Sequence, residues 1–279
     1  MLPLLFKSLI KIISHEDLEK YTNKLYIEYS KIKIIKKLLG QIESISNIPR
    51  EILSRYYTRL YTLPSIFHKN LNKNLGKGEN DDYISFVKIL YEGVKLKSLT
   101  LASDKILYRG SLISDKEIEK IQKNICNKKY GLPGSIVFSR SFLSFSKDRQ
   151  KAKNFMINAT PTKNLCRVLY ILEKDNNIGY DLSTHCDMEN ISFYPEEKEV
   201  LFFPFSVFEI KEIIQIENKI EKYQIKLLYL GKYLKDIKND KNLTKKGNPL
   251  PISEYKKQLT ELGLFEKENI EQMDTKTLY

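Results

Sequence analysis

The sequence predicts an α+β protein, and two observations support this fold class. The first hundred of its 279 residues keep apolar side chains at a spacing of three to four, which is typical of helices. From Lys105 onward the pattern changes to short apolar runs rich in Ile, Val, Phe and Tyr, separated by turns. Only two helices are expected among these runs, so the order is not a repeating strand-helix unit.

Two helices are predicted within the first sixty residues. Ser14 opens a capping-box-like start for the first helix, and Gly40 is its expected end. Asn47 is expected to cap the second helix, with Pro49 near its first turn. The apolar side of this second helix is predicted to hold Ile52, Leu53, Tyr56 and Leu60.

Two further helices complete the predicted helical region, residues 1–100. The third is expected from about Pro64 to Leu75, where Gly76 and Gly78 end it. Asn80 is expected to cap the fourth helix. The buried face of that helix is predicted to hold Ile84, Val87, Tyr91 and Val94.

Six strands are predicted in the next domain, residues 101–231, with helices among them near residues 115–124 and 148–157. A C-terminal extension, residues 232–279, is lysine-rich and then acidic, and it is expected to be loosely held. The predicted strands span residues 106–108, 136–138, 167–172, 199–203, 207–216 and 225–230.

The charge balance would attract polyanions, because 47 Lys and Arg against 35 Asp and Glu give a net charge of +12. Only seven of these cations are arginines. Base readout and phosphate recognition favour the planar, bidentate guanidinium group over the lysine ammonium. We therefore expect no dedicated binding of nucleic acid.

Several other classes of site are excluded by missing motifs. The three cysteines are widely spaced without a CxxC pair, which indicates a reducing compartment and no disulfide framework. The three histidines form no HxxxH or HExxH pair, so no metal is expected. P-loop, Rossmann and hydrolase-elbow motifs are also missing. The sequence offers no transmembrane segment and no secretory signal.

Three segments carry side chains that are unusual for a purely structural sheet, and the first surrounds Arg109. This arginine ends an apolar strand and precedes Gly110, which allows another group to approach the backbone closely. A cation in that position suits a diphosphate. The structural alternative is an Arg109 paired with a nearby carboxylate.

The second segment is Ser-Phe-Leu-Ser-Phe-Ser at residues 141–146. Strand alternation would direct Ser144 and Ser146 to one face and Phe145 to the other. Ser146 alternatively caps the helix that follows it. Both roles are compatible if Ser146 caps the helix while Ser144 binds a ligand.

The third segment contains two glutamates that are two residues apart, Glu197 and Glu199. At a strand start they would project from one face, with Lys198 on the other. Two carboxylates at the edge of an apolar strand repel each other and lose solvation, which is typical of sites where their chemistry is needed. The structural alternative is a solvated acidic turn.

Together, Arg109, the Ser-x-Ser segment and the Glu-x-Glu segment resemble the arginine-serine-glutamate class of mono-ADP-ribosyltransferases, in its arginine-specific branch. The resemblance covers roughly residues 52–217, and Glu-Glu-Lys-Glu-Val-Leu-Phe-Phe-Pro is its most specific part. Ser-Phe-Ser departs from the usual Ser-Thr-Ser at the residue facing away from the cleft. The resemblance implies a helical region packed on a two-sheet catalytic core, with NAD bound between the sheets.

The resemblance also implies a reaction, the transfer of ADP-ribose from NAD to an arginine side chain of a target protein, with release of nicotinamide and without a metal. Arg109 would bind the phosphates of NAD, with Gly110 beside the nicotinamide amide. Ser144 would bind the nicotinamide-side ribose and orient Glu199, which would stabilise the oxocarbenium-like transition state. Glu197 would hold the target guanidinium.

Three aromatic residues complete the implied NAD site: Tyr108, Phe142 and Phe155. For the two phenylalanines, packing in the core is the alternative role. The family's surface enzymes carry paired cysteines that this chain lacks. This difference favours an intracellular protein or a bacterial effector. The acidic C-terminus resembles the translocation signals of bacterial type IV effectors, so we expect a secreted effector acting in host cytosol, with a cytoplasmic protein as the alternative.

Two other functions remain open from the sequence. One is an NAD glycohydrolase of the same fold, in which water replaces the arginine. The other is a catalytically silent module that binds a partner through its lysines.

Overall fold

The computed structural model describes residues 14–29, 31, 48–63, 66–77, 84–126, 135–158, 165–174, 183–204, 206–216 and 220–232. The chain divides into two compact units, and every described residue belongs to the unit formed by residues 12–233. The predictions for Gly40, Asn47, Gly78 and Asn80, and for the extension beyond residue 232, lie outside the described residues.

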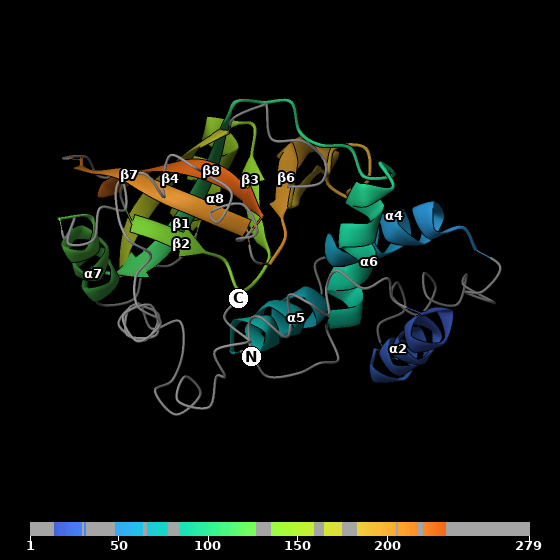
Figure 1. Ribbon diagram of the computed structural model, residues 1–279. Coiled ribbons are helices and arrows are strands. Elements are labelled where there is room, and N and C mark those ends of the chain that lie inside the picture. Colours follow the sequence, from blue (N-terminus) through green and yellow to red (C-terminus); the bar gives the residue numbers. More distant parts are fainter. Residues whose placement is uncertain are drawn as a thin grey trace, which may run out of the picture. The chain divides into compact units, whose positions relative to one another are not determined.

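In the described part of the chain, four helices precede the first strand (Figure 1). The first begins as predicted, because Ser14 Oγ accepts a hydrogen bond of 3.0 Å from the Asp17 backbone N–H. The third helix was predicted to end at Gly76. This end is wrong, because the observed helix continues through Gly76 to Lys77. The four helices are α2 (His15–Glu28), α4 (Arg50–Tyr61), α5 (Ile66–Lys77) and α6 (Ile84–Lys95).

The buried side of α4 differs from the predicted one. Leu53 and Leu60 are buried as expected, but Ile52 is 51% exposed, so its predicted place on that side is wrong. Tyr57 and Tyr61 are buried instead. A tyrosine can bury its ring while its hydroxyl finds a hydrogen-bond partner, which a pattern of apolar residues underestimates.

Helices α4 and α6 lie close together because of a glycine. A Cβ added to Gly93 would lie 2.5 Å from the Ser54 Cβ, so a larger residue would force the two helices apart. Val87 and Val94 are buried on α6, as predicted. None of the helices in the described ranges is both long and apolar enough to cross a membrane.

Among the described residues, eight strands form one mixed sheet, which confirms the α+β class. Their order is β2-β7-β8-β4-β1-β3-β6-β5, and all neighbours are antiparallel except β4 and β8. Strands β3 and β5 were not among the six predicted strands. The strands are β1 (Ile106–Ser114), β2 (Ser135–Phe138), β3 (Leu143–Ser146), β4 (Leu165–Lys174), β5 (His185–Asp187), β6 (Glu199–Phe202), β7 (Ser206–Gln215) and β8 (Tyr223–Lys232).

The sheet has two halves that meet between β1 and β3. Strand β1 pairs with β4 over its whole length, but it pairs with β3 only where Tyr108 lies opposite Ser146. Strand β3 then pairs with β6 along all four of its residues. The two expected sheets are therefore joined through a single residue pair.

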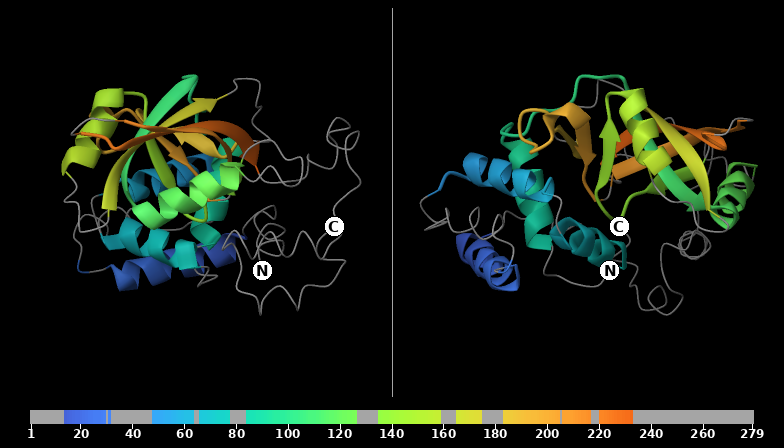
Figure 2. Two further views of the ribbon diagram at one scale, coloured as in Figure 1. Left: turned by 90° about the vertical axis from the view of Figure 1, so that its left-hand side faces the viewer. Right: turned by 180° about the vertical axis from the view of Figure 1, so that it is seen from behind.

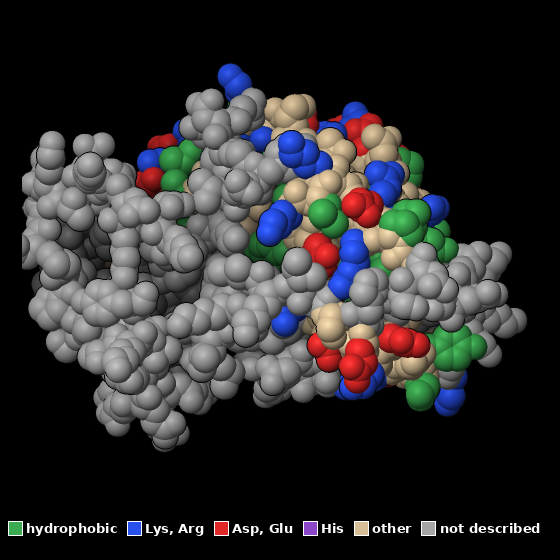
Figure 3. All heavy atoms as spheres, turned by 45° about the vertical axis from the view of Figure 1, so that its right-hand side comes forward, with side chains coloured by type: hydrophobic (Ala, Val, Ile, Leu, Met, Phe, Trp, Pro, Cys, Tyr) green, Lys and Arg blue, Asp and Glu red, His purple; other side chains and the backbone are tan. Residues whose placement is uncertain are grey.

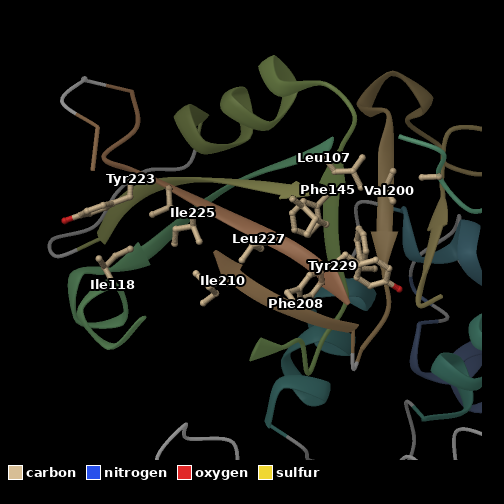
Figure 4. Close-up of a cluster of buried hydrophobic side chains, with 14 of the residues drawn as sticks. Leu107, Ile118, Phe145, Val200, Phe208, Ile210, Tyr223, Ile225, Leu227 and Tyr229 are labelled. Atoms are coloured by element: carbon tan, nitrogen blue, oxygen red, sulfur yellow. The ribbon is translucent and has the colours of Figure 1, made fainter. Parts of the chain in front are cut away.

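Two helices flank the sheet, α7 (Asp115–Cys126) and α8 (Arg149–Asn158). Helix α8 packs across β1 and contacts β3 and β4 (Figure 2). On the other side, Phe145, Val200 and Phe202 join the buried apolar cluster with Phe208 and Tyr229 (Figure 4). Because strand side chains alternate, Ser144, Ser146 and Glu199 must lie on the opposite face of β3 and β6.

Candidate active site

The two glutamates of the Glu-x-Glu segment occupy different backbone conformations. Glu197 ends a short 3₁₀ turn (Pro195–Glu197), and Glu199 is the first residue of β6. Between them, Lys198 has a left-handed conformation with a φ of 50°, an uncommon conformation for a residue with a side chain. The turn leaves Glu197 partly exposed, whereas Glu199 is only 9% exposed.

Burial raises the pKa of Glu199 from 4.5 to about 7. A hydrogen bond from Ser144 and the charge of Arg109 favour the ionised form, and the charge of Glu197 opposes it. Burial and the neighbouring Glu196 also raise the pKa of Glu197, while Lys151 lowers it. The pair therefore consists of a partly solvated carboxylate and a buried carboxyl group that titrates near neutral pH.

The two serines of β3 have different roles. Ser146 Oγ donates a hydrogen bond of 2.8 Å to the Glu197 carbonyl and accepts one of 3.0 Å from the Asp148 N–H. Asp148, rather than Ser146, caps α8, because its Oδ1 accepts from the backbone of Gln150 at 2.8 Å. Ser146 thus ties the glutamate turn to β3, whereas Ser144 favours the ionised form of the Glu199 carboxyl group.

Arg109 reaches the same place from β1. Its Nη1 donates a hydrogen bond of 2.8 Å to the Ser144 carbonyl. Burial lowers the pKa of Arg109, while the neighbouring Tyr61, Tyr170 and Glu199 raise it. Among the described residues no carboxylate forms an ion pair with this guanidinium. A guanidinium has five N–H donors, so the remaining donors fit an anionic group such as a diphosphate.

Gly110 allows a close approach, and the approaching group is α8. A Cβ at this position would lie 2.1 Å from the Ala152 carbonyl oxygen and 2.8 Å from the Met156 Cβ. Any larger residue would therefore displace α8 from β1. Tyr108, the neighbour of Arg109, pairs with Ser146 at the junction of the two half-sheets.

An aromatic wall borders the site. Two of its rings come from the helical region, Tyr61 of α4 and Phe86 of α6, and two come from the sheet, Phe142 just before β3 and Phe203 just after β6. The ring of Phe142 lies 4.9 Å from that of Tyr61 and 5.9 Å from those of Phe86 and Phe203, between centroids. Phe142 is 3% exposed, which supports its alternative role in the core. Phe155 is 51% exposed on α8, so core packing was the wrong alternative for it.

Two side chains next to the site were not singled out by the sequence analysis, Tyr61 of α4 and Asn72 of α5. Asn72 Nδ2 donates to Tyr61 Oη at 2.9 Å, and Asn72 Oδ1 accepts from the Phe142 N–H at 3.0 Å. Burial raises the pKa of Tyr61 and the charge of Glu199 adds to this, while Asn72, Arg109 and Ser144 lower it. Asn72 and Phe142 are 70 positions apart, and no local pattern signals such a contact.

The described ranges contain no group of three or more His, Cys, Asp or Glu side chains that could hold a metal. Lys147 forms ion pairs with Asp187 at 2.6 Å and Glu189 at 2.9 Å, beside the turn. On the face shown in Figure 3, the lysines and arginines of the described residues are interspersed with carboxylates.

No protein-family model and no curated protein sequence matches this chain. Solved structures resemble it at low identity. ADP-ribosyltransferase HopU1 of Pseudomonas syringae pv. Tomato DC3000 has a TM-score of 0.50 and 12% identity, covering 79% of this chain and 99% of that one. The Vis toxin from Vibrio splendidus, also an ADP-ribosyltransferase, has a TM-score of 0.48 and 15% identity, covering 81% of this chain and 90% of that one.

The ADP-ribosyltransferase toxin Plx2a from Paenibacillus larvae gives a TM-score of 0.45 at 19% identity, covering 77% of this chain and 97% of that one. At such identities the likeness concerns the fold and leaves the activity to be argued from the site. The match to HopU1 extends over nearly the whole of that chain. The chain has the fold of the ADP-ribosyltransferases.

Proposed function

We propose that this chain is a mono-ADP-ribosyltransferase of the arginine-serine-glutamate class, which transfers ADP-ribose from NAD to an arginine side chain of a target protein. The observation that supports this proposal most is the convergence of Arg109, Ser144 and Glu199, from three strands, near the junction between the half-sheets. The fold, shared with ADP-ribosyltransferases, adds to it.

In this proposal NAD is a substrate held along β1 and β3. Arg109 binds its diphosphate with the N–H donors that the Ser144 carbonyl leaves available. The Ser144 hydroxyl lies beside Glu199 and binds the ribose on the nicotinamide side. Tyr108 and the backbone of Gly110, whose other face packs on α8, border the NAD substrate, and the exposed ring of Phe155 on α8 covers the nicotinamide.

Bond cleavage separates the ribose from a leaving group that is already cationic. The electron pair of the glycosidic bond moves to the nicotinamide nitrogen, which becomes neutral and needs no acid. Positive charge then develops on the ribose, and the ionised carboxyl group of Glu199 stabilises it only in the transition state. The rate should therefore rise with pH as Glu199 ionises near pH 7.

Glu197 has the second task, which concerns the acceptor. Its partly exposed carboxylate can hold an arginine side chain that enters from solvent. When a guanidinium nitrogen forms the new bond to the ribose, Glu197 accepts the proton that this nitrogen loses. Glu197, which lies outside the buried part of the site, thus determines which acceptor reacts.

The experiment that tests this proposal follows nicotinamide release from NAD, with agmatine as a guanidinium acceptor and cadaverine as a matched amine without a guanidinium. Wild type is expected to form ADP-ribosyl-agmatine and no ADP-ribosyl-cadaverine. Glu199→Gln should reduce nicotinamide release by about a thousandfold, as expected for loss of a transition-state charge partner. Glu197→Gln should abolish transfer to agmatine and leave hydrolysis within a few-fold of wild type.

Glu196→Gln is the matched control, because Glu196 is the exposed neighbour of Glu197 in the same turn. Transfer that survives Glu197→Gln would contradict the arginine assignment, and water as the main acceptor would indicate an NAD glycohydrolase. If wild type releases no nicotinamide with either acceptor or with a host-cell lysate, the enzyme proposal is wrong, and the lysine-rich binding module takes its place. We further propose that the chain acts as a bacterial effector in host cytosol.

A further inference from the structure

We propose that Lys147 is a positioning residue for the Glu-x-Glu segment. Its backbone N–H holds the glutamate turn, and its ammonium group holds residues 187–189, which in turn hold the start of β6. Lys147 directly follows Ser146, the last residue of β3. Its catalytic meaning rests on the proposed function, but the contacts that support it are hydrogen bonds and ion pairs among the described residues.

Three successive backbone carbonyls of the Glu-x-Glu segment each accept a hydrogen bond. Ser146 Oγ donates to the carbonyl of the first glutamate at 2.8 Å, and the Lys147 N–H donates to the Lys198 carbonyl at 3.0 Å. The Glu199 carbonyl accepts from the Met188 N–H at 2.9 Å. Two of these donors lie at the end of β3, and the third directly follows β5. The positions of both glutamates therefore depend on how these two segments are held together.

The ammonium group of Lys147 connects the two segments. Lys147 Nζ lies 2.6 Å from Asp187 Oδ2 and 2.9 Å from Glu189 Oε2, so it binds the carboxylates on both sides of Met188. A third carboxylate, that of Asp104 in the segment before β1, lies 3.8 Å away. The Lys147 side chain is 16% exposed. Water and salt therefore screen these attractions less than those of an ion pair at the open surface.

Asp187 uses both of its carboxylate oxygens. Oδ2 accepts from the Lys147 ammonium group, and Oδ1 accepts from the Glu189 N–H at 3.0 Å. The Asp187 N–H donates to the Thr100 carbonyl at 2.7 Å, which ties the same segment to the chain before β1. An amide side chain at position 187 has a single oxygen, so it cannot accept both bonds. Loss of the ammonium group and loss of this second oxygen should thus loosen the same contact.

The cation and its partner are ionised at neutral pH. Burial lowers the pKa of Lys147, but hydrogen bonds to Asp187 and Glu189 outweigh this and raise the pKa above its usual value. The same hydrogen bond and the charge of Lys147 hold the pKa of Glu189 below its usual range. The cluster is therefore in place before NAD binds. A carboxylate that is already positioned needs no reorganisation when charge develops in the transition state.

Lys147→Met removes the charge but keeps a long side chain and the backbone N–H. It should lower kcat for nicotinamide release by roughly ten- to a hundredfold and leave KM for NAD within about threefold, because a displaced Glu199 weakens the transition state more than substrate binding. Lys147→Arg keeps the charge and should retain most of the activity. Asp187→Asn should reproduce the loss. The double variant with Lys147→Met should be no worse than either single variant, since both remove one contact.

Lys222→Met is the matched control. Lys222 forms an ion pair of 2.8 Å with Asp115, between the residue before β8 and the start of α7. This substitution removes the same charge and also breaks an ion pair, but that ion pair does not involve the glutamate turn. It should leave kcat and KM unchanged.

The measurement that does not depend on turnover is hydrogen exchange at the Met188 amide, in the full chain without NAD. Met188 is buried, and its N–H is the donor to the Glu199 carbonyl. Lys147→Met and Asp187→Asn should speed its exchange by about tenfold or more, whereas Lys222→Met should not. The amides of β4 report unfolding of the whole sheet and should exchange as in wild type.

Faster exchange at Met188 without a change in β4, together with the loss of kcat, supports the positioning role. Unchanged exchange at Met188 in Lys147→Met overturns it. An increase of the same size throughout β4 also overturns it, because Lys147 would then stabilise only the fold as a whole. A loss confined to KM would indicate a contact with substrate and overturn it as well. Absence of turnover in wild type would refute the proposed function alone, since the exchange measurement still tests the contacts of Lys147.

Discussion

The start of β6 and the aromatic wall border the same site, but they contribute to stability in opposite ways. The wall gathers four rings, two from α4 and α6 and two from the residues next to β3 and β6, and packing of this kind is favourable. The start of β6 holds Glu199 buried beside Glu197, which burial and like charge both disfavour. The comparison indicates that the wall offsets the cost of holding the carboxylate in place.

The largest effect is expected in the wall. Phe142→Ala removes the ring that contacts the other three members, and it should lower the free energy of unfolding by about 3–5 kcal/mol. Urea unfolding with an unchanged slope would measure this loss. Phe155→Ala, at an exposed ring, is the control and should cost much less. Equal losses in the free energy of unfolding for the two variants would mean that the wall stabilises the fold no more than an exposed ring does.

At β6, by contrast, we expect that removing a side-chain charge increases the free energy of unfolding. The pKa of Glu199 is raised on folding, from 4.5 to about 7, so the folded state binds its proton more tightly than the unfolded state. The wild type therefore loses stability as pH rises from 4.5 to 7, by up to about 3 kcal/mol, and the deficit persists at higher pH.

Glu199→Gln removes that titration and should be more stable than wild type at pH 8.5, with a much smaller difference at pH 4.5. Thermal unfolding at both pH values checks this, and Glu196→Gln serves as the exposed control. If Glu199→Gln is less stable than wild type at pH 8.5, the carboxylate stabilises the fold. The start of β6 would then not differ from the aromatic wall in the sign of its contribution to stability.

The smallest effect is expected at Ser146, which connects the glutamate turn to β3. Ser146→Ala loses the bonds to the Glu197 carbonyl and the Asp148 N–H, for a cost of about 1–2 kcal/mol. Since no titrating group is removed, this loss should be the same at pH 5 and pH 8.5 in urea unfolding. A loss that depends on pH would couple Ser146 to Glu199 and sharpen the account of the turn.

Local patterns predicted most of the strand half of the site. Alternation placed Ser144 and Ser146 on one face, and the apolar run after Glu199 marked β6 correctly. The turn was not predictable in the same way, because the left-handed conformation of Lys198 follows from bonds that the neighbouring segments make with it.

The helical half of the site was not predicted, for a different reason. Counting apolar residues placed Ile52 on the buried side of α4 and passed over Tyr61. Tyr61 contacts Asn72 and Phe142, which are distant from it in sequence, so only the folded chain brings the three residues together. Side-chain contacts between segments so far apart have no local signature.

The parallel pairing of β4 with β8 has a consequence for the order in which the chain is made. Strand β4 pairs with β1 soon after both have left the ribosome, but its other edge stays open until β8, the last described strand, has been synthesised. An open strand edge is a template for pairing with other chains. Nascent chains that stop before β8 should therefore aggregate, and the cell that makes this protein must protect that edge during synthesis.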